Sequence, residues 1–172
     1  MHTRPDPEET MDDPQATETD REFLRATIAV ATRSREHGNH PFGAVLVDDQ
    51  GRVVLEAENG VTTEHDMLSH AEVTLARQAW RLFGAERLAG YSLYTSAEPC
   101  AMCSGAIYWS GIGRVVYALA ERSLLGLTGD DPENPTMSVD SRVVLNGGQR
   151  AIEVVGPALE DEAAAPHAGF WN

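Results

Sequence analysis

The chain has 172 residues, a length that suits one domain with a full hydrophobic core. It carries 13 basic and 27 acidic side chains, a net charge of −14, which disfavours a polynucleotide partner and favours a small substrate of little charge. No segment is apolar for long enough to span a bilayer, and the N-terminus lacks the apolar core of a signal peptide. We therefore expect a cytoplasmic protein without membrane contact.

The chain divides into an expected leader and one expected domain. Residues 1–19 are rich in Pro, Asp, Glu and Thr, a composition typical of disordered segments, so we expect a disordered acidic leader there. Residues 20–172 are expected to form a single domain that ends in a tail at 157–172. Its first element is a predicted helix over 21–38, with apolar residues at helical spacing, Asp20 as its cap and Gly38 as its stop.

The following segments alternate between strand and helix patterns. Apolar, β-branched runs at 43–47 and 52–57, joined by Asp-Asp-Gln-Gly, predict a β-hairpin. The same criteria predict, in chain order, a helix at 69–84, a strand at 92–96, a helix at 100–111, a strand at 114–120, a loop at 130–135, a last strand at 141–147 or 152–156, and a terminal helix or tail at 159–172. This order favours an α/β sheet with helices on its faces.

The only two cysteines, Cys100 and Cys103, stand in the stretch Glu-Pro-Cys-Ala-Met-Cys. Such a pair can be a disulfide, a redox pair, half of a metal site or two core residues. If the pair opens a helix, both sulfurs can face one ion, and the helix N-terminus stabilises thiolates. A catalytic zinc needs a third protein ligand, and His70, at the start of another predicted helix, is the candidate.

His70 and Glu72, followed by Pro-Cys-x-x-Cys, match the zinc deaminase pattern. In that pattern the metal lowers the pKa of a bound water to give an attacking hydroxide, and Glu72, which is not a ligand, moves protons to the ring and to the departing amine. A zinc-binding protein without activity is the alternative. Glu72 argues against it, because a structural site has no use for an unliganded carboxylate at this spacing.

With these motifs the chain resembles the cytidine/deoxycytidylate deaminase-like superfamily, in particular its branch of guanine deaminases, nucleoside deaminases and tRNA adenosine deaminases. The resemblance runs from about Glu22 to about Leu125 and rests on the segments 40–47, 69–80 and 93–118. It implies a three-layer α-β-α fold with a central mixed five-stranded sheet, one zinc per chain held by His70, Cys100 and Cys103, Glu72 as proton shuttle, and a homodimer or larger assembly.

The resemblance also implies substrate contacts. Asn59 is expected to hydrogen-bond the base, or only to shape a turn. Phe42 and Gly43 are expected to form a wall against the base, with the backbone N–H groups of Ala71 and Cys100 nearby. Trp109 is expected to line the pocket, although it and Phe42 could be plain core.

Two groups near the C-terminal end complete the expected contacts. Asp130 and Asp131 are candidates to meet the base, although they could equally serve only the loop. Phe170 and Trp171 are expected to close over an active site, in the same or a neighbouring subunit.

Free bases and nucleosides are the expected substrates. Guanine is the leading candidate, and the alternatives of the same mechanism are cytosine, isoguanine, adenine or a nucleoside. A tRNA adenosine deaminase comes after these, because the acidic tail at 159–172 lacks the basic residues that would hold RNA.

Overall fold

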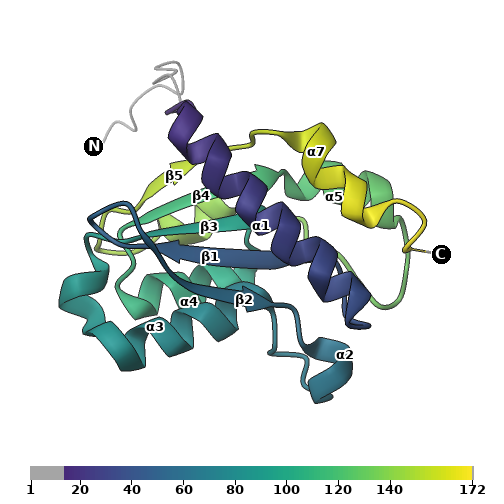
Figure 1. The fold of residues 1–172 in the computed structure, drawn as a ribbon, viewed down its shortest axis with the longest axis horizontal. Coiled ribbons are helices and arrows are strands. Elements are labelled where there is room, and N and C mark those ends of the chain that lie inside the picture. Colours follow the sequence, from purple (N-terminus) through teal and green to yellow (C-terminus); the bar gives the residue numbers. More distant parts are fainter. Residues whose placement is uncertain (1–13, 172) are drawn as a thin grey trace, which may run out of the picture.

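The computed structural model describes residues 14–171 and shows a central sheet between two layers of helices (Figure 1). The helices are α1 (Glu18–Glu36), α2 (Val61–Glu64), α3 (Ala71–Leu88), α4 (Ala101–Ser110), α5 (Glu121–Thr128), α6 (Ser141–Leu145) and α7 (Glu160–Ala164), followed by a 3-10 helix, η1 (Ala165–His167). The strands are β1 (Gly43–Val47), β2 (Val53–Glu58), β3 (Ser92–Ala97), β4 (Arg114–Leu119) and β5 (Glu153–Val155). The expected three-layer α/β fold is confirmed.

The sheet is mixed and has the order β2-β1-β3-β4-β5. Strand β1 pairs antiparallel with β2 and β3, whereas β3–β4 and β4–β5 are parallel. Helix α4 connects the parallel strands β3 and β4, so β3 must end at the edge of the sheet where α4 begins. The segment Glu98–Cys100 follows β3 directly and therefore lies at the carboxyl end of a central strand, where α/β proteins place their ligands.

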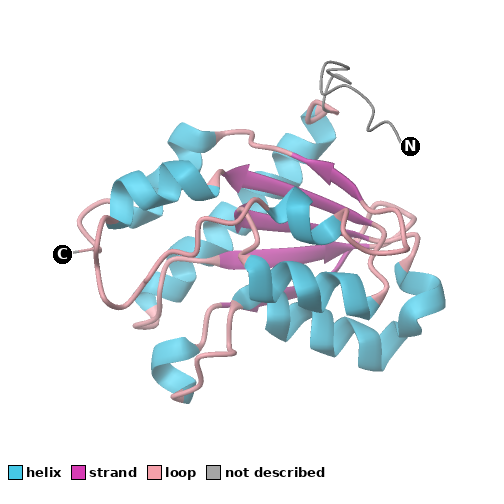
Figure 2. Ribbon diagram, turned by 180° about the vertical axis from the view of Figure 1, so that it is seen from behind, coloured by secondary structure: helices cyan, strands magenta, loops and turns pink. Residues whose placement is uncertain are grey.

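Alternating side chains of the strands build two cores. In β1, Ala44 and Leu46 pack in the core that α3, α4 and α6 share, whereas Val45 and Val47 pack in the core that α1, α5 and α7 share. Figures 1 and 2 show these two sets of helices on opposite faces of the sheet. Both faces of the central strands are thereby buried, which keeps the carboxyl ends of β3 and β4 in fixed positions.

Several element boundaries differ from the sequence expectation. The expected leader at 1–19 overlaps α1, which begins at Glu18, and residues 1–13 lie outside the described part of the chain. Thr17, not Asp20, is the N-cap: its hydroxyl accepts the N–H of Asp20 at 3.1 Å, and the Asp20 carboxylate accepts the N–H of Thr17 at 2.9 Å. This capping box uses Asp where Glu or Gln is usual, so the expectation was wrong by one turn.

The hairpin of β1 and β2 is confirmed. Later in the chain, one of the two segments considered for the last strand is a helix, and one further helix was not expected. Residues 141–147 contain α6, so the last strand is the alternative, β5. Helix α5 follows β4 without having been predicted. Among residues 14–171, no helix combines the length and the apolar character that crossing a membrane requires.

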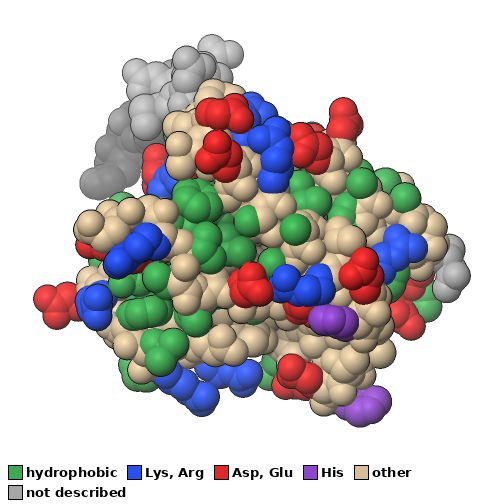
Figure 3. Space-filling view, viewed as in Figure 1, with side chains coloured by type: hydrophobic (Ala, Val, Ile, Leu, Met, Phe, Trp, Pro, Cys, Tyr) green, Lys and Arg blue, Asp and Glu red, His purple; other side chains and the backbone are tan. Residues whose placement is uncertain are grey.

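Figure 3 shows the face of the molecule that carries α1 and β2. Basic and acidic side chains of the described residues lie side by side on it. Arg33, for example, pairs with Glu56 and Glu58, at 2.6 Å each. Arg33 is thus partnered by carboxylates.

Candidate active site

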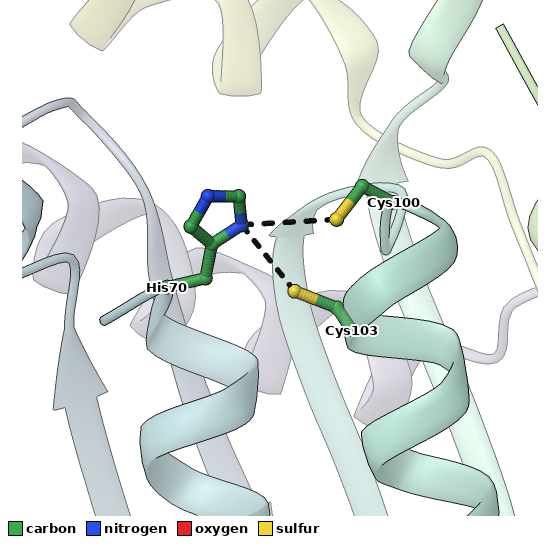
Figure 4. A group of neighbouring side chains, drawn as sticks. All are labelled: His70, Cys100 and Cys103. Atoms are coloured by element: carbon green, nitrogen blue, oxygen red, sulfur yellow. Dashed lines mark hydrogen bonds between the residues drawn. The ribbon is translucent and has the colours of Figure 1, made fainter. Parts of the chain in front are cut away.

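Two helix starts bring three ligand-type side chains together. His70 is the N-cap of α3, Cys100 is the N-cap of α4, and Cys103 lies in the first turn of α4. Helices α3 and α4 lie side by side, so the imidazole faces both sulfurs (Figure 4). The Nδ1 atom of His70 is 3.7 Å from Sγ of Cys100 and 3.4 Å from Sγ of Cys103, and the three ligand atoms lie within 4.8 Å of one another.

These separations fit a tetrahedral zinc ion. Zn–S and Zn–N bonds of about 2.3 and 2.05 Å at a tetrahedral angle put sulfur and nitrogen about 3.6 Å apart, between the two observed values. Both cysteines are free thiols, so the disulfide interpretation does not apply. Hydrogen bonds from Cys103 and His70 lower the pKa of Cys100 to about 4, which gives that sulfur the thiolate character a metal needs.

Glu72 is buried beside this cluster but is not one of its three members. Its Oε2 atom accepts a hydrogen bond from the Cys103 thiol at 3.5 Å, and its Oε1 atom accepts one from the Thr95 hydroxyl at 2.9 Å. Burial raises the pKa of Glu72 above its ordinary value. A carboxyl that can hold a proton next to the metal site is what a proton shuttle requires.

A cavity of about 40 Å³ lies against the cluster. Its lining residues are Phe42, Asn59, His70, Glu72, Ala97, Glu98, Cys100, Glu121, Leu124 and Asn134. The expected residues Phe42 and Asn59 therefore both reach it. Oδ1 of Asn59 accepts the N–H of Val61 at 3.0 Å, so Asn59 does shape a turn, and its Nδ2 amide is the group left to meet a ligand.

The backbone expected to approach the substrate lies at the two helix starts. Ala71 is the first residue of α3 and is fully buried, and Cys100 is the N-cap of α4. The N–H groups of a first helical turn have no partner within the helix. They are therefore free to meet an electron-rich atom of a ligand.

Two expected pocket residues lie elsewhere. Gly43 packs against α1: an added Cβ would lie 2.6 Å from the backbone nitrogen of Ala31 and 2.7 Å from the carbonyl oxygen of Thr27, so the glycine permits helix–strand packing. Trp109 is 81% exposed on the outer side of α4 and shares a shallow groove with Trp80 of α3. Neither residue lines the cavity, and both expectations are corrected.

The loop after α5 reaches the cavity through a residue that the sequence analysis did not name. Asp130 is exposed, and Asp131 is buried and accepts the N–H of Glu133 at 2.9 Å. Neither aspartate lines the cavity, whereas Asn134 does. The Asp131 bond to the loop backbone supports the structural role considered above.

The C-terminal tail packs behind the cavity wall of its own chain. The Trp171 ring lies 6.2 Å from Phe42 and 5.3 Å from His40, and its Nε1 atom donates to Nδ1 of His167 at 3.0 Å. Phe170 lies 6.0 Å from His40 and beneath the guanidinium of Arg35. The two aromatic residues thus support Phe42 from outside and are not themselves part of the cavity lining.

Besides Asn134, four lining residues escaped the sequence analysis: Ala97, Glu98, Glu121 and Leu124. Glu121 and Leu124 belong to α5, which was not predicted. Burial and the nearby Cys100 raise the pKa of Glu121 to about 7. Glu98 was quoted only as the residue before Pro-Cys. An acidic residue directly before two candidate metal ligands was the signal that could have found it.

The fold and the site together define an α/β enzyme built around a His-Cys-Cys zinc site with a buried acid beside it. Residues 17–119 match the cytidine and deoxycytidylate deaminase zinc-binding region. The chain belongs to this family and is a zinc-dependent hydrolytic deaminase, with His70, Cys100 and Cys103 as its candidate zinc site.

Known proteins similar to this chain in sequence or structure are named as deaminases of different substrates. The chain is 42% identical to a probable cytosine deaminase of Schizosaccharomyces pombe, over 94% of this chain and 98% of that protein. It is 46% identical to the guanine deaminase of Bacillus subtilis, over 56% of this chain and 62% of that protein. A structure from a study of A-to-I editing by tRNA:A34 deaminases superposes with a TM-score of 0.66, at 32% identity, over 85% of this chain and 99% of the other.

Proposed function

We propose that the chain removes the amino group of a free nucleobase by hydrolysis, with cytosine as the first candidate. The observation that carries this proposal is a cavity lined both by the buried acid Glu72 and the candidate zinc ligands His70 and Cys100 and by the apolar side chains of Phe42 and Leu124. Similarity to the probable cytosine deaminase over nearly the whole chain supports a small pyrimidine without a sugar as the substrate.

The residues divide the work of the reaction among them. His70, Cys100 and Cys103 would hold the zinc, which when bound lowers the pKa of a coordinated water and supplies a nucleophile near neutral pH. Glu72 takes a proton from the attacking water and returns protons to the ring nitrogen and the leaving amine. The water oxygen bonds to the ring carbon, the C–N bond breaks, and the amine leaves as ammonia.

Two further groups orient and enclose the base. The Nδ2 amide of Asn59 can donate to a carbonyl oxygen of the base, while its Oδ1 is held by the turn. Phe42 and the buried Leu124 supply apolar surface for the ring and exclude water. The Thr95 hydroxyl, 2.9 Å from Glu72, keeps that carboxyl directed to one place.

Guanine, the substrate favoured by sequence, is the second candidate because identity with the guanine deaminase reaches 46% within the shared part. A panel of cytosine, guanine, adenine, isoguanine, cytidine, guanosine and a tRNA with adenosine at position 34 tests the proposal by ammonia release. We expect turnover of cytosine above that of guanine, and of free bases above nucleosides. Activity confined to the tRNA or to nucleosides would overturn the proposal, and RNA is disfavoured by the charge of −14.

The tail is part of this proposal through its contact with Phe42. Deleting residues 166–172 removes Phe170 and Trp171 and with them the outer support of the cavity wall. We expect KM for the base to rise about tenfold, since the lost positioning costs on the order of 1.4 kcal/mol. Unchanged turnover and affinity would refute a role of the tail in the site.

We further propose a cytoplasmic homodimer that takes part in nucleobase salvage. Free thiols as metal ligands suit a reducing compartment. The groove between α3 and α4 exposes Trp80 by 55% and Trp109 by 81%, and it also carries Arg77 and Arg81. Among the described residues neither arginine makes an ion pair, so this groove offers aromatic and cationic anchors to a second copy of an acidic chain.

A further inference from the structure

Glu98 is a buried carboxylate, 5% exposed, between the end of β3 and the metal-binding residue Cys100. Its Oε2 atom accepts the N–H of Glu121 at 2.9 Å. Its Oε1 atom accepts the N–H of Ser141 at 2.9 Å and the hydroxyl of Ser141 at 2.8 Å. One side chain therefore joins the metal-binding loop to the first turns of both α5 and α6.

Neither of these helices has a capping side chain of its own. The N-cap residues of α5 and α6, Ala120 and Asp140, make no side-chain capping bond. Glu98 thus satisfies N–H groups that have no partner within their helices. A buried carboxylate is tolerable only when its acceptor positions are filled in this way, so the three bonds fix Glu98 and both helices relative to each other.

Glu98 also stands between two cavities. The cavity of about 40 Å³ beside Cys100 and a larger one of about 600 Å³ are both lined by Glu98 and Glu121. The larger cavity contains further polar side chains, among them Arg122, Ser123 and Asp140. The hydrogen bond between the Glu98 carboxylate and the Glu121 N–H therefore lies in the wall that the two cavities share.

We propose that Glu98 is a positioning residue for the deaminase site. It holds the loop that carries Cys100 at a fixed distance from the start of α5, and so keeps Glu121 and Leu124 in place as the far wall of the base cavity. Its carboxylate oxygens accept from the backbone of α5 and α6, and it is not one of the candidate metal ligands, so it acts through the elements that it holds. The proposal rests on the proposed function only for its effect on substrate, because its effect on the metal site is independent of which base is used.

Glu98→Gln tests the proposal with little change of shape. One amide oxygen can still accept, but the amide NH₂ then faces either the Glu121 N–H or the Ser141 donors, so one side of the connection is lost. Residues that orient metal ligands typically cost 10–100-fold in metal affinity or activity when changed. We expect affinity for Co²⁺, measured by competition with a chelator, to fall at least tenfold, and the thiolate-to-cobalt absorption to change.

In the zinc-loaded variant we expect KM for the base to rise by at least tenfold and kcat to change by less than threefold, because the wall and not the proton shuttle is affected. Glu160→Gln is the matched control. Glu160 of α7 also caps α5, accepting the N–H of Ala120 at 3.0 Å and the Ser123 hydroxyl at 2.7 Å, but it has no link to the metal-binding loop.

The control should lose thermal stability without a change in Co²⁺ affinity, cobalt spectrum or KM. Equal effects of the two variants on these quantities would overturn the proposal, since Glu98 would then be only a helix cap. If Glu98→Gln does not fold, Ser141→Ala removes one of the three bonds, and wild-type Co²⁺ affinity and KM in that variant would also overturn it. A wild type that releases no ammonia from any base would refute the proposed function and leave the cobalt measurements valid.

Discussion

At the scale of single residues, Glu72 separates an enzyme from a metal-binding protein. Glu72→Gln keeps the size of the side chain and its contact with Thr95 but removes the group that carries protons. We expect zinc content to stay at one per chain while kcat falls by about 10²–10⁴-fold, the usual contribution of general acid–base catalysis. Elemental analysis measures the zinc content, and the rate of ammonia release measures kcat.

Glu86→Gln, on the exposed side of the same helix, is the control and should match the wild type. Substantial ammonia release by Glu72→Gln would contradict the assigned role. Loss of zinc from it would mean that Glu72 contributes to metal binding.

Residue identities predicted the reacting cluster but not the surroundings of the base. Cys100 and Cys103 were predictable because their spacing within one helical turn is local, and His70 because it completes the zinc deaminase pattern at another helix start. The direction of the Trp109 side chain was missed, although its angle about the helix axis follows from its spacing. Six residues after Cys103 correspond to about 240°, which turns Trp109 away from the metal side.

At the scale of elements, one buried ion pair connects α1 to the sheet. The Asp20 carboxylate accepts from Arg114 of β4 at 2.8 and 3.0 Å and from the hydroxyl of Tyr94 of β3 at 2.8 Å. Burial alone raises the pKa of Asp20, but the hydrogen bonds from Arg114, Thr17 and Tyr94 outweigh burial and hold the pKa far below its ordinary value. Asp20 therefore stabilises the fold in its ionised form.

The sign of the pH dependence follows from this lowered pKa. The contribution is fully present above about pH 4, the pKa in the unfolded chain, and is lost as the pH falls through the lower folded value. We expect Asp20→Asn to lose about 3 kcal/mol at pH 7, as broken buried pairs do, and the difference from wild type to shrink toward pH 2. Urea unfolding across pH 2–7 measures this.

The exposed pair Arg25–Glu162 provides the comparison for Asp20. Glu162→Gln should cost under about 1 kcal/mol at every pH, because exposed ion pairs contribute little. A pH-independent loss in Asp20→Asn would show that shape, and not charge, matters at this position.

A second pH effect is expected at the tail. Burial, and after it the charge of Arg35, lowers the pKa of His167 to about 4, so the neutral ring accepts from Trp171. Arg35 also donates to the carbonyl oxygens of Pro166 and Ala168, both at 2.7 Å. The nearby His40 contacts Trp171 and pairs with Glu133.

The unfolded imidazole titrates near pH 6.5, so the packed tail loses stability as the pH falls from 6.5 to 4, by about 3 kcal/mol in total. We expect amide exchange in residues 165–171 to accelerate relative to α3 between pH 7 and pH 5, after correction for intrinsic rates. His167→Gln, which can still accept from Trp171, should remove this dependence. Its persistence in the variant would assign the effect to a group other than His167.

Two elements that sequence did not predict, α5 and α6, share one physical property. Helices α5 and α6 have no capping side chain of their own, and Glu98 and Glu160, distant in sequence, supply their caps. The residue pattern within these helices therefore contains little of what stabilises them. In addition, the β-branched residues of 141–147 are typical of a strand. By contrast, the long helices α1 and α3 and the hairpin were predictable because their periodicity is local.

At the scale of the whole molecule, the exposed groove of α3 and α4 is the surface through which we propose that two copies assemble. Two tryptophans so exposed are costly in a monomer, and Trp and Arg are the residues that most often anchor interfaces. Since the chain carries a charge of −14, we expect Arg77 and Arg81 to pair with carboxylates of a second copy. We expect light scattering to give twice the chain mass of 18.7 kDa for the wild type.

The double variant Trp80→Ser and Trp109→Ser should dissociate to the monomer, and Arg77→Glu should weaken the dimer more at low salt than at high salt. Leu82→Ser is the matched control, because Leu82 is an exposed apolar residue of α3 outside the groove, and it should leave the dimer intact. A monomeric wild type at micromolar concentration, or a dimer that survives the double variant, would place the interface elsewhere or remove it. His70 and Glu72 lie at the start of α3, and the outer side of the same helix forms this groove. The double variant therefore also shows whether assembly affects the site. Unchanged kcat/KM in the monomer would mean that the cavity of each chain is complete by itself.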